Sequence, residues 1–452
     1  MLTKLWAKNF KSWENTGEIK LAPLTGLFGT NSSGKTSLLQ LILMLKQTVE
    51  SSDRSRVLHT GDRNTYVDLG TFYDLIYRHQ LPGHINFGLE WEDKDLSDFL
   101  PKDMAKTFRK EKGGDLISFE SEVTGDTNSV EVEKFIYRFR EYQFGMQKQG
   151  QAEKYDLTAP GYELKRNRGK PWALPKPIKS YGFPDQVNAY YQNLGFLSDL
   201  VFAFEKIFEN IYYLGPLREY PNRNYGWAGE QPQDVGSRGG NAIPALLASR
   251  KKGATISQGR GRGHVKQYVD ERVAEWLKEL NLIDSFRLHQ IAENSREYEV
   301  RVRRSPSSTE VLITDVGFGV SQILPVLVLC YYAPEGSTLI LEQPEIHLHP
   351  SVQAGLADVF IDIIQTRNIQ IILESHSEHL LRRLQRRVAE EKLPANRAAL
   401  YFTRSENGKS ELNSLKLDDF GNIQNWPPNF FGDEIGELAA MTEAAMTRMI
   451  KK

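Results

Sequence analysis

The sequence has little of three features that would narrow its class at once: cysteine, net charge and long apolar runs. It contains one cysteine in 452 residues, so no disulfide can form within the chain, as is typical of a reducing compartment. Its formal net charge of −1 gives no whole-chain field that would attract nucleic acid or an anionic membrane. No apolar stretch reaches membrane-spanning length and the N-terminal residues alternate in polarity, so we expect a cytoplasmic protein with no signal peptide and no membrane contact.

A sustained heptad pattern and an internal repeat are also missing. We therefore expect no long coiled-coil arms, which argues against tethering over chromosome-scale distances. What is present is an apolar content of 40%, enough for a core in two or three domains, or in one domain with a large insertion. The lone cysteine, Cys330, lies in the apolar run 323–330, where we expect it to fill the core.

The most informative stretch is residues 29–36, which has the pattern G-x-x-x-x-G-K-T between an apolar strand and a helical run. A strand, a glycine-bearing loop and a helix start in this order predict a phosphate-binding loop. Backbone N–H groups would face the phosphates of a nucleotide, Lys35 would add a positive charge, and Thr36 would ligate Mg²⁺. The predicted nucleotide-binding residues are Gly29, Asn31, Ser32, Ser33, Gly34, Lys35, Thr36 and Ser37.

A second anion-binding pattern stands at residues 315–322, ahead of an apolar helix predicted over 323–331. Gly317, Gly319 and Ser321, followed by Gln322, would leave N–H groups free at a helix start with little steric bulk. The pattern also suits a glycine turn before a core helix, so taken alone it leaves both interpretations open.

Two later apolar strands, 338–341 and 369–373, are predicted to end in polar tips. The tip residues that carry chemistry are Glu342, Gln343, Glu345 and His376. A carboxylate at the end of a buried strand, beside a phosphate loop, is where a parallel α/β sheet places its Mg²⁺ ligand. A transition-metal site is the alternative for the same region, formed by these glutamates with His347, His349, His376 and His379, although zinc would not explain the phosphate loop.

Taken in order, these motifs resemble the ABC-type ATPase heads of the structural-maintenance and RecF-like class. They resemble more closely the stand-alone ATPases related to the overcoming-lysogenization-defect family, including the PARIS-type ATPases of bacterial anti-phage defence. Residues 29–36 match Walker A, 315–322 resemble the signature loop, and 339–342 resemble Walker B. Residues 348–350 resemble the D-loop, and 420–431 are similar to a tail found in ATPases of defence loci.

The resemblance implies an α/β fold: an ABC-type phosphate-loop ATPase head with a β-rich N-terminal lobe, a mostly parallel core sheet and an α+β insertion. We expect residues 1–91 to form the first part of the head, 92–210 the insertion, 211–435 the second part of the head, and 436–452 a C-terminal helix.

The resemblance also implies ATP and Mg²⁺ as cofactors. Thr36 and Glu342 would hold the metal, and His376 would contact the γ-phosphate. Gln343 stands where the family usually has a catalytic glutamate, so either Gln343 or Glu345 would position the attacking water and hydrolysis would be slow. The signature loop would contact ATP held by a neighbouring subunit, which implies a homodimer or a higher homo-oligomer; its residues are Gly317, Gly319, Ser321 and Gln322.

Three points stay open at this level. Gln47 and Gln80 are both candidates for the Q-loop glutamine of the family. Arg218, after the buried strand 211–214, would either reach a phosphate in trans or form a surface ion pair. The basic, aromatic segment 154–184 is either a solvated loop or a contact for single-stranded nucleic acid.

We therefore expect an ATPase whose nucleotide-dependent assembly senses infection and holds or releases a separate effector, a nuclease or toxin, in anti-phage defence. The alternative is a DNA-binding or DNA-end-processing ATPase of recombination and repair. The stretch 438–452 is too short for a nuclease domain after the head, which favours the first hypothesis.

Overall fold

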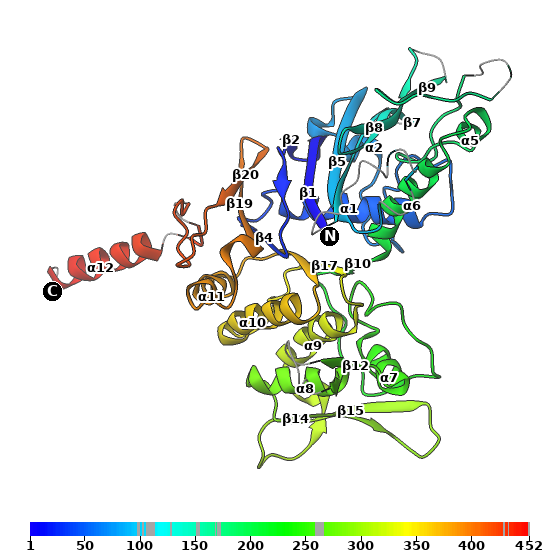
Figure 1. Ribbon diagram of the computed structural model, residues 1–452. Helices are drawn as coiled ribbons and strands as arrows, with labels where there is room; N and C mark the ends of the chain where they lie inside the picture. The colour runs from blue at the N-terminus through cyan, green and yellow to red at the C-terminus, as the bar shows by residue number, and fades with distance from the viewer. Residues whose placement is uncertain are drawn as a thin grey trace.

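The chain folds into a β-rich lobe, a central sheet and a layer of helices beneath that sheet (Figure 1). This computed structural model describes residues 1–96, 100–101, 104, 114–126, 129–150, 154–167, 169, 173–257, 266–427, 430–432 and 434–450. Within that part of the chain, none of the helices combines the length and the apolar character needed to cross a bilayer.

An antiparallel sheet of eight strands forms the first lobe, in the order β2-β1-β5-β6-β7-β8-β9, with β3 also paired to β1. Its strands are β1 (Leu2–Phe10), β2 (Trp13–Asn15), β3 (Ile19–Lys20), β5 (Gly83–Asp93), β6 (Asp115–Gly125), β7 (Val130–Phe139), β8 (Tyr142–Lys148) and β9 (Tyr155–Thr158). The boundary predicted at 91/92 falls inside β5, and the strands from the predicted insertion continue this sheet.

A six-stranded sheet crosses the centre in the order β10-β17-β18-β4-β19-β20. The strands are β10 (Ile211–Leu214), β17 (Thr338–Glu342), β18 (Gln370–Glu374), β4 (Leu24–Gly29), β19 (Ala398–Glu406) and β20 (Lys409–Leu415). All its pairings are parallel except that of β19 with β20. The C-terminal ends of β4, β17 and β18 therefore meet at one edge, where α/β sheets bind ligands.

The fold class is mixed α/β, but the expected mostly parallel core describes only this one sheet. Over the described residues the molecule is built mainly from antiparallel sheets, because short turns join most of its strands and parallel pairing needs long crossovers. Two smaller antiparallel sheets are formed by β11 (Tyr225–Gly226), β14 (Ser285–Gln290), β15 (Glu297–Arg303) and β16 (Val311–Leu312), and by β12 (Thr255–Ser257) and β13 (Lys266–Tyr268).

Helices cover both faces of the central sheet, and its strands are apolar on both faces for that reason. In β17, Leu339 and Leu341 belong to one apolar cluster and Ile340 to the other. The first cluster includes α7 (Ala242–Lys252), α8 (Val269–Glu279), α9 (Phe318–Tyr332), α10 (Pro350–Thr366) and α11 (Glu378–Ala389), and the second includes α1 (Lys35–Glu50) and α6 (Phe196–Glu209).

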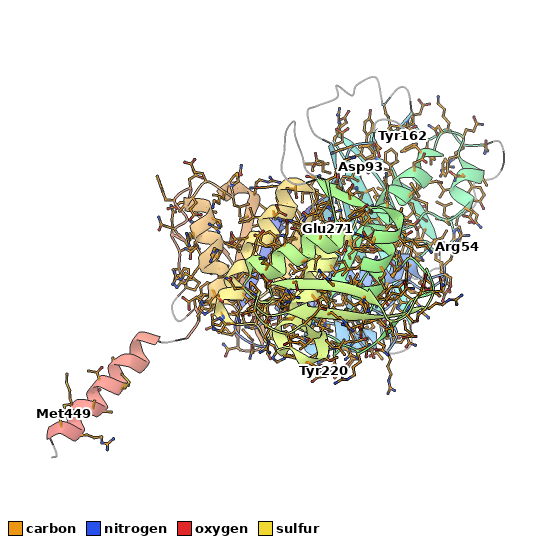
Figure 2. All side chains as sticks on the ribbon, turned by 90° about the horizontal axis from the view of Figure 1, so that it is seen from below. Arg54, Asp93, Tyr162, Tyr220, Glu271 and Met449 are labelled. Carbon is orange, nitrogen blue, oxygen red and sulfur yellow. The ribbon has the colours of Figure 1, made fainter. Side chains whose placement is uncertain are left out.

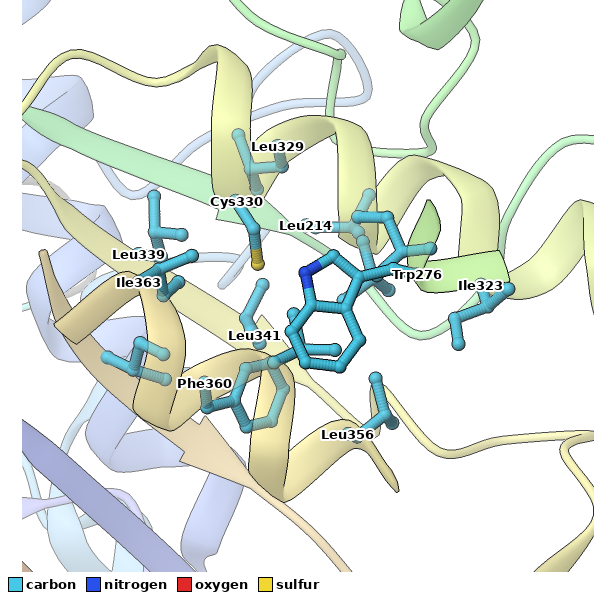
Figure 3. Close-up of a cluster of buried hydrophobic side chains, with 14 of the residues drawn as sticks. Leu214, Trp276, Ile323, Leu329, Cys330, Leu339, Leu341, Leu356, Phe360 and Ile363 are labelled. Carbon is cyan, nitrogen blue, oxygen red and sulfur yellow. The ribbon is translucent and has the colours of Figure 1, made fainter. Parts of the chain in front are cut away.

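Cys330 lies in the first cluster, near Leu339 and Phe360 (Figure 3). The thiol is free and fully buried, and burial raises its pKa. The prediction that this cysteine fills the core is confirmed.

Two helices, α5 (Gln186–Tyr190) and α6, precede the central strand β10. Between them, Asn193 bonds to the backbone of Glu163 and Lys165, so its side chain holds the chain against the neighbouring loop instead of continuing the helix. At the C-terminal end, α12 (Glu434–Ile450) extends away from the body of the protein, with Met449 near its tip (Figure 2).

Candidate active site

The phosphate loop joins β4 to α1 and takes its shape from three residues with positive φ: Gly29 at 138°, Ser32 at 56° and Gly34 at 91°. A Cβ on Gly29 would lie 2.1 Å from the carbonyl oxygen of Thr403 in β19. Asn31 and Ser32 are exposed at the tip, whereas Ser33 is buried with its Oγ 2.7 Å from Thr403 Oγ1. The loop is therefore moulded against a strand that comes much later in the chain.

Replacing Gly29 with alanine is expected to lower the free energy of unfolding by about 3 kcal/mol, because the added methyl group would overlap the β19 backbone. Urea denaturation of the nucleotide-free protein measures this loss. Gly17→Ala is the matched control, because Gly17 also has a positive φ, of 64°, but its added Cβ meets nothing within 4 Å. Its expected cost is about 1 kcal/mol; equal losses in both variants would contradict the steric explanation.

Lys35 is the first residue of α1, and its ammonium lies within the loop. Its Nζ donates to the carbonyl oxygens of Gly29 at 3.2 Å and Thr30 at 2.7 Å, and lies 4.0 Å from Glu374 Oε1. The side chain is 2% exposed, and burial lowers its pKa against the opposing charges of Glu374 and Glu345. A phosphate entering the loop would meet a buried cation and the N-terminal end of a helix.

The carboxylates that end β17 and β18 meet beside this helix. Glu342 and Glu374 are register partners on adjacent parallel strands, and both are buried. Thr36 Oγ1 donates to Glu374 Oε2 at 2.7 Å, and the Tyr213 hydroxyl donates to Glu342 Oε1 at 3.1 Å. Burial and the charge of Glu374 raise the pKa of Glu342 to about 7. Two carboxylates and a hydroxyl form an oxygen-rich cluster that suits Mg²⁺.

Sequence reasoning missed Glu374 as a site residue. It is bonded to Thr36 because β18, and not β17, is the strand beside β4 in the sheet. The available signal was a second apolar strand ending in a glutamate, which the prediction used only to place His376.

The turns after the two strands contribute the remaining tip residues. Gln343 adopts a φ of 44°, and its N–H donates to the Glu374 carbonyl oxygen at 2.9 Å. Glu345 is 5% exposed; its Oε1 accepts from the His376 N–H at 2.7 Å, and its buried Oε2 has no partner among the described residues. Burial and the charge of Lys35 lower the pKa of His376, so its imidazole is neutral near pH 7.

The predicted signature loop is the first turn of α9. Gly317 precedes the helix and is exposed, Phe318 begins it, and Gly319 follows within the first turn. Ser321 and Gln322 are buried, and Ser321 Oγ donates to the carbonyl oxygen of Phe318 at 2.7 Å, so this hydroxyl does not face solvent. The accessible part of the pattern is its glycine end.

This end of α9 lies beside a different set of residues from the phosphate loop. The Phe318 ring centroid is 5.5 Å from that of Tyr220, which is labelled in Figure 2, and 5.2 Å from that of His347. The structure thus brings residues 29–36, 342–345 and 374–376 together at one edge, and places the glycine end of α9 near the turn that follows β17.

Two other sequence-based options have no support in the geometry. Gln47 is buried and bonds to the backbone of His59 and Val67, so it fixes the segment after α1, while Gln80 is an exposed loop residue. For the transition-metal option, the described residues contain no group of three or more His, Cys, Asp or Glu side chains placed to hold a metal ion. His349 instead accepts from the Ser351 N–H and caps α10.

The basic segment 154–184 is described in part, because Arg168, Lys170 and Trp172 lie outside the described residues. Lys165 and Arg166 are exposed. The Tyr162 ring packs against those of Phe144 and Phe196, with centroid distances of 5.3 and 6.0 Å. Tyr162 therefore contributes to packing and is not a free surface for stacking a base.

A comparison with protein families gives a match over the part of the chain that contains α9, β17 and β18. Residues 262–381 match a family model described as an AAA ATPase domain. This match spans the start of α9 and the tips of β17 and β18, and it supports an ATPase. Residues 393–441 match a family of unknown function, and a search of the curated proteins gave no match.

Among solved structures, the chain is similar to three heads of structural-maintenance (SMC) proteins. One is an SmcHead bound to the C-winged helix domain of ScpA, with 13% identity over 92% of this chain and 98% of that one, and a TM-score of 0.46. The SMC head domain from Thermotoga maritima has 12% identity over 92% and 99%, with a TM-score of 0.42. An Smc head with an extended coiled coil, bound to the C-terminal domain of ScpA derived from Pyrococcus furiosus, has 11% identity over 92% and 96%, with a TM-score of 0.44.

Proposed function

We propose that this protein is an ABC-type ATPase that binds and hydrolyses ATP with Mg²⁺, and that its nucleotide-dependent assembly holds or releases an effector in bacterial anti-phage defence. One observation carries the enzymatic part: the buried Lys35 ammonium inside a glycine-shaped loop, next to the Thr36–Glu374 hydrogen bond at the tips of parallel strands. The phosphates of a nucleoside triphosphate would bind to the Lys35 ammonium and to the N-terminal end of α1.

The residues present fit a divalent cation. Thr36, Glu342 and Glu374 offer oxygen ligands in one cluster, and burial with the charge of Glu374 raises the pKa of Glu342, a penalty that a bound cation would offset. When bound, Mg²⁺ would neutralise charge on the phosphate oxygens. Thr36 and the two glutamates would hold it, with Tyr213 fixing the orientation of Glu342.

Hydrolysis needs a group that orients water and accepts its proton. The Gln343 amide would orient water but accepts protons poorly. Glu345 is the stronger candidate for proton acceptor, because it is buried at the same edge and has one oxygen without a partner. Neutral His376, whose backbone holds Glu345, would donate a hydrogen bond to the γ-phosphate. Because the glutamine at position 343 accepts protons poorly, we expect this site to hydrolyse ATP slowly.

Assembly is proposed from the second anion-binding helix end. The glycine end of α9 is exposed and would face a phosphate bound by another copy of the chain, giving a homodimer or larger assembly with ATP between subunits. Phe318 and Tyr220 would give this interface an aromatic centre, since they are 39% and 76% exposed. The role in defence, with a nuclease or toxin as partner, is supported by the motif resemblance.

Mass photometry with and without Mg²⁺ and ATP tests the assembly. The expected result is a shift from the monomer mass of 51.6 kDa to about twice that value or more when ATP is added. Phe318→Asp is expected to weaken the ATP-dependent assembly at least tenfold, because a charge would be buried at the contact, and to leave the ATP affinity of the monomer within about twofold.

Phe202→Asp is the matched control, because Phe202 is also an exposed phenylalanine, at 58%, but lies on α6. It should assemble as wild type does. A wild-type protein that stays monomeric when ATP is added would disprove the assembly. Co-purification with the product of the neighbouring gene would test whether the protein binds an effector.

A DNA-binding ATPase is the second candidate, and one surface favours it. Arg287 and Arg301 stand directly opposite each other on β14 and β15, next to the pair of Ser285 with Arg303. Arg301 is paired with Glu299 and Glu310, whereas Arg287 has no ion pair among the described residues, so Arg287 would be the cation available to a DNA phosphate. Fluorescence anisotropy with a labelled duplex tests this: affinity that falls steeply with salt and is lost in Arg287→Ala would favour the DNA-binding role.

A further inference from the structure

Arg218 is a buried arginine whose guanidinium makes no hydrogen bond to any residue that the structure describes. It follows β10, is 5% exposed, and its Nε, Nη1 and Nη2 atoms all lack a partner within the described structure. Burial lowers its pKa to about 10, while the charges of Glu345 and Tyr213 act in the opposite direction. An unpaired buried guanidinium is costly, so its position calls for an explanation beyond packing. Neither the surface ion pair nor the trans contact considered from the sequence suits a residue this deeply buried.

Glu345 is the complementary group. It is also 5% exposed, and its Oε2 has no hydrogen-bond donor in the described structure. The other groups that face this carboxyl are the ammonium of Lys35 from α1, and the Ser375 hydroxyl and His376 N–H from the turn after β18. Arg218 and Glu345 follow adjacent parallel strands, in which Leu214 of β10 and Leu341 of β17 are register partners, so both residues lie at the same sheet edge. The two charges act on each other's pKa. A donor-only fork and an acceptor-only oxygen are thus both buried and unpartnered in the same region.

The backbone on each side of Arg218 is fixed. The Gly215 N–H donates to the carbonyl oxygen of Ser237 at 2.8 Å, and the Glu219 N–H donates to the carbonyl oxygen of Arg238 at 2.9 Å. Tyr213, at the other end of this segment, bonds to Glu342. The segment after β10 is therefore held against the strand tips, and little backbone freedom is left to carry the guanidinium out to solvent.

We propose that Arg218 is a positioning residue for ATP hydrolysis, whose guanidinium supplies the counter-charge that orients the Glu345 carboxylate beside the phosphate loop. The inference rests on the proposed ATPase function and specifies how one residue of that site is controlled. Arg218 acts through Glu345 and not on the nucleotide. Its removal should therefore change the chemical step and leave ATP binding intact.

Steady-state hydrolysis and equilibrium ATP binding of Arg218→Met, Arg218→Lys, Glu345→Gln and the Arg218→Met/Glu345→Gln double variant test the proposal. Arg218→Met should lower kcat at least tenfold with ATP affinity within about threefold of wild type. Arg218→Lys keeps the charge and should recover part of the loss. The double variant should be no slower than Glu345→Gln alone, because the target of Arg218 is already absent.

Arg367→Met is the matched control for removing a buried arginine. Arg367 is 8% exposed, has an unpartnered Nε, and bonds to the Cys330 carbonyl oxygen away from the strand tips. The Arg367→Met variant should have the same kcat as wild type. Loss of ATP affinity in Arg218→Met would mean that Arg218 contacts the nucleotide directly, and additive losses in the double variant would mean that it acts independently of Glu345; either result overturns the proposal.

A double-mutant cycle on the thermal unfolding of nucleotide-free protein keeps the test independent of activity. The change in melting temperature caused by Arg218→Met should differ between the wild-type and Glu345→Gln backgrounds. Equal changes in the two backgrounds would overturn the proposed coupling of Arg218 to Glu345. Failure of the wild-type protein to bind or hydrolyse ATP would instead disprove the proposed function. Because the wild type is measured first, this failure is distinguished from a failure of the Arg218 proposal.

Discussion

Replacing Lys35 with alanine is expected to weaken ATP binding by about 100-fold, or roughly 3 kcal/mol, and to abolish hydrolysis. The ammonium is the buried cation of the phosphate loop, held by the Gly29 and Thr30 carbonyl oxygens, which cannot bind a phosphate themselves. Without it, an entering triphosphate would meet carbonyl oxygens and the Glu374 carboxylate with no compensating charge. Titration with a fluorescent ATP analogue measures the affinity.

Lys46 provides the control on the same helix. It is 3% exposed, donates to the Phe208 carbonyl oxygen at 2.7 Å and pairs with Glu50 at the same distance. Lys46→Ala should therefore reduce stability but leave ATP affinity within about twofold. Equal losses of affinity in the two variants would show that the effect comes from the helix and not from the phosphate loop.

Replacing Glu342 with glutamine is expected to stabilise the nucleotide-free protein at pH 8 by up to about 3 kcal/mol, while removing a proposed metal ligand. Burial and Glu374 hold the pKa of Glu342 at about 7 in the folded protein, above its ordinary value of 4.5. Between these two values the folded state binds the proton more strongly than the unfolded state. The glutamate therefore costs stability progressively as pH rises from about 4.5 to 7, and glutamine has no such cost.

Urea denaturation at pH 5.5 and pH 8 measures this gain, which should be larger at the higher pH. Glu390 provides a control of opposite sign, since Arg387 and Arg386 hold its pKa at about 2. The stability it contributes is lost only as pH falls toward that value, so the effect of Glu390→Gln should be the same at pH 5.5 and 8. A Glu342→Gln variant that is less stable at both pH values would contradict the electrostatic explanation.

Short-range patterns predicted the local structure of residues 29–36, because a strand, a loop and a helix start lie within one contiguous stretch. The same patterns could not show that β18 is the neighbour of β4, which is why Glu374 was missed. Thr403, which shapes the loop at Gly29, and Ser410, which would meet a Cβ on Gly34 at 2.4 Å, come from β19 and β20. Only the folded sheet places them there.

The boundary predicted at 91/92 lies inside a strand for a related reason. A change in composition near residue 92 indicated a new domain, yet β5 crosses that point and β6 pairs along its whole length. Hydrogen bonding between strands continues across a change in side-chain character, since it depends on the backbone. The burial of Arg218 also had no sequence signal, because a single arginine after a strand is most often exposed.

The pairing of β4 with β18 and β19 has a consequence for biosynthesis. Gly29 leaves the ribosome early, but its strand partner Thr403 follows much later in the chain. At ordinary translation rates this delay is on the order of tens of seconds. During that time β4 is an apolar segment with both edges unpaired, which is a target for chaperones, and the nascent chain has no finished pocket for ATP. The capacity to bind nucleotide should therefore appear only after β19 has emerged and paired with β4.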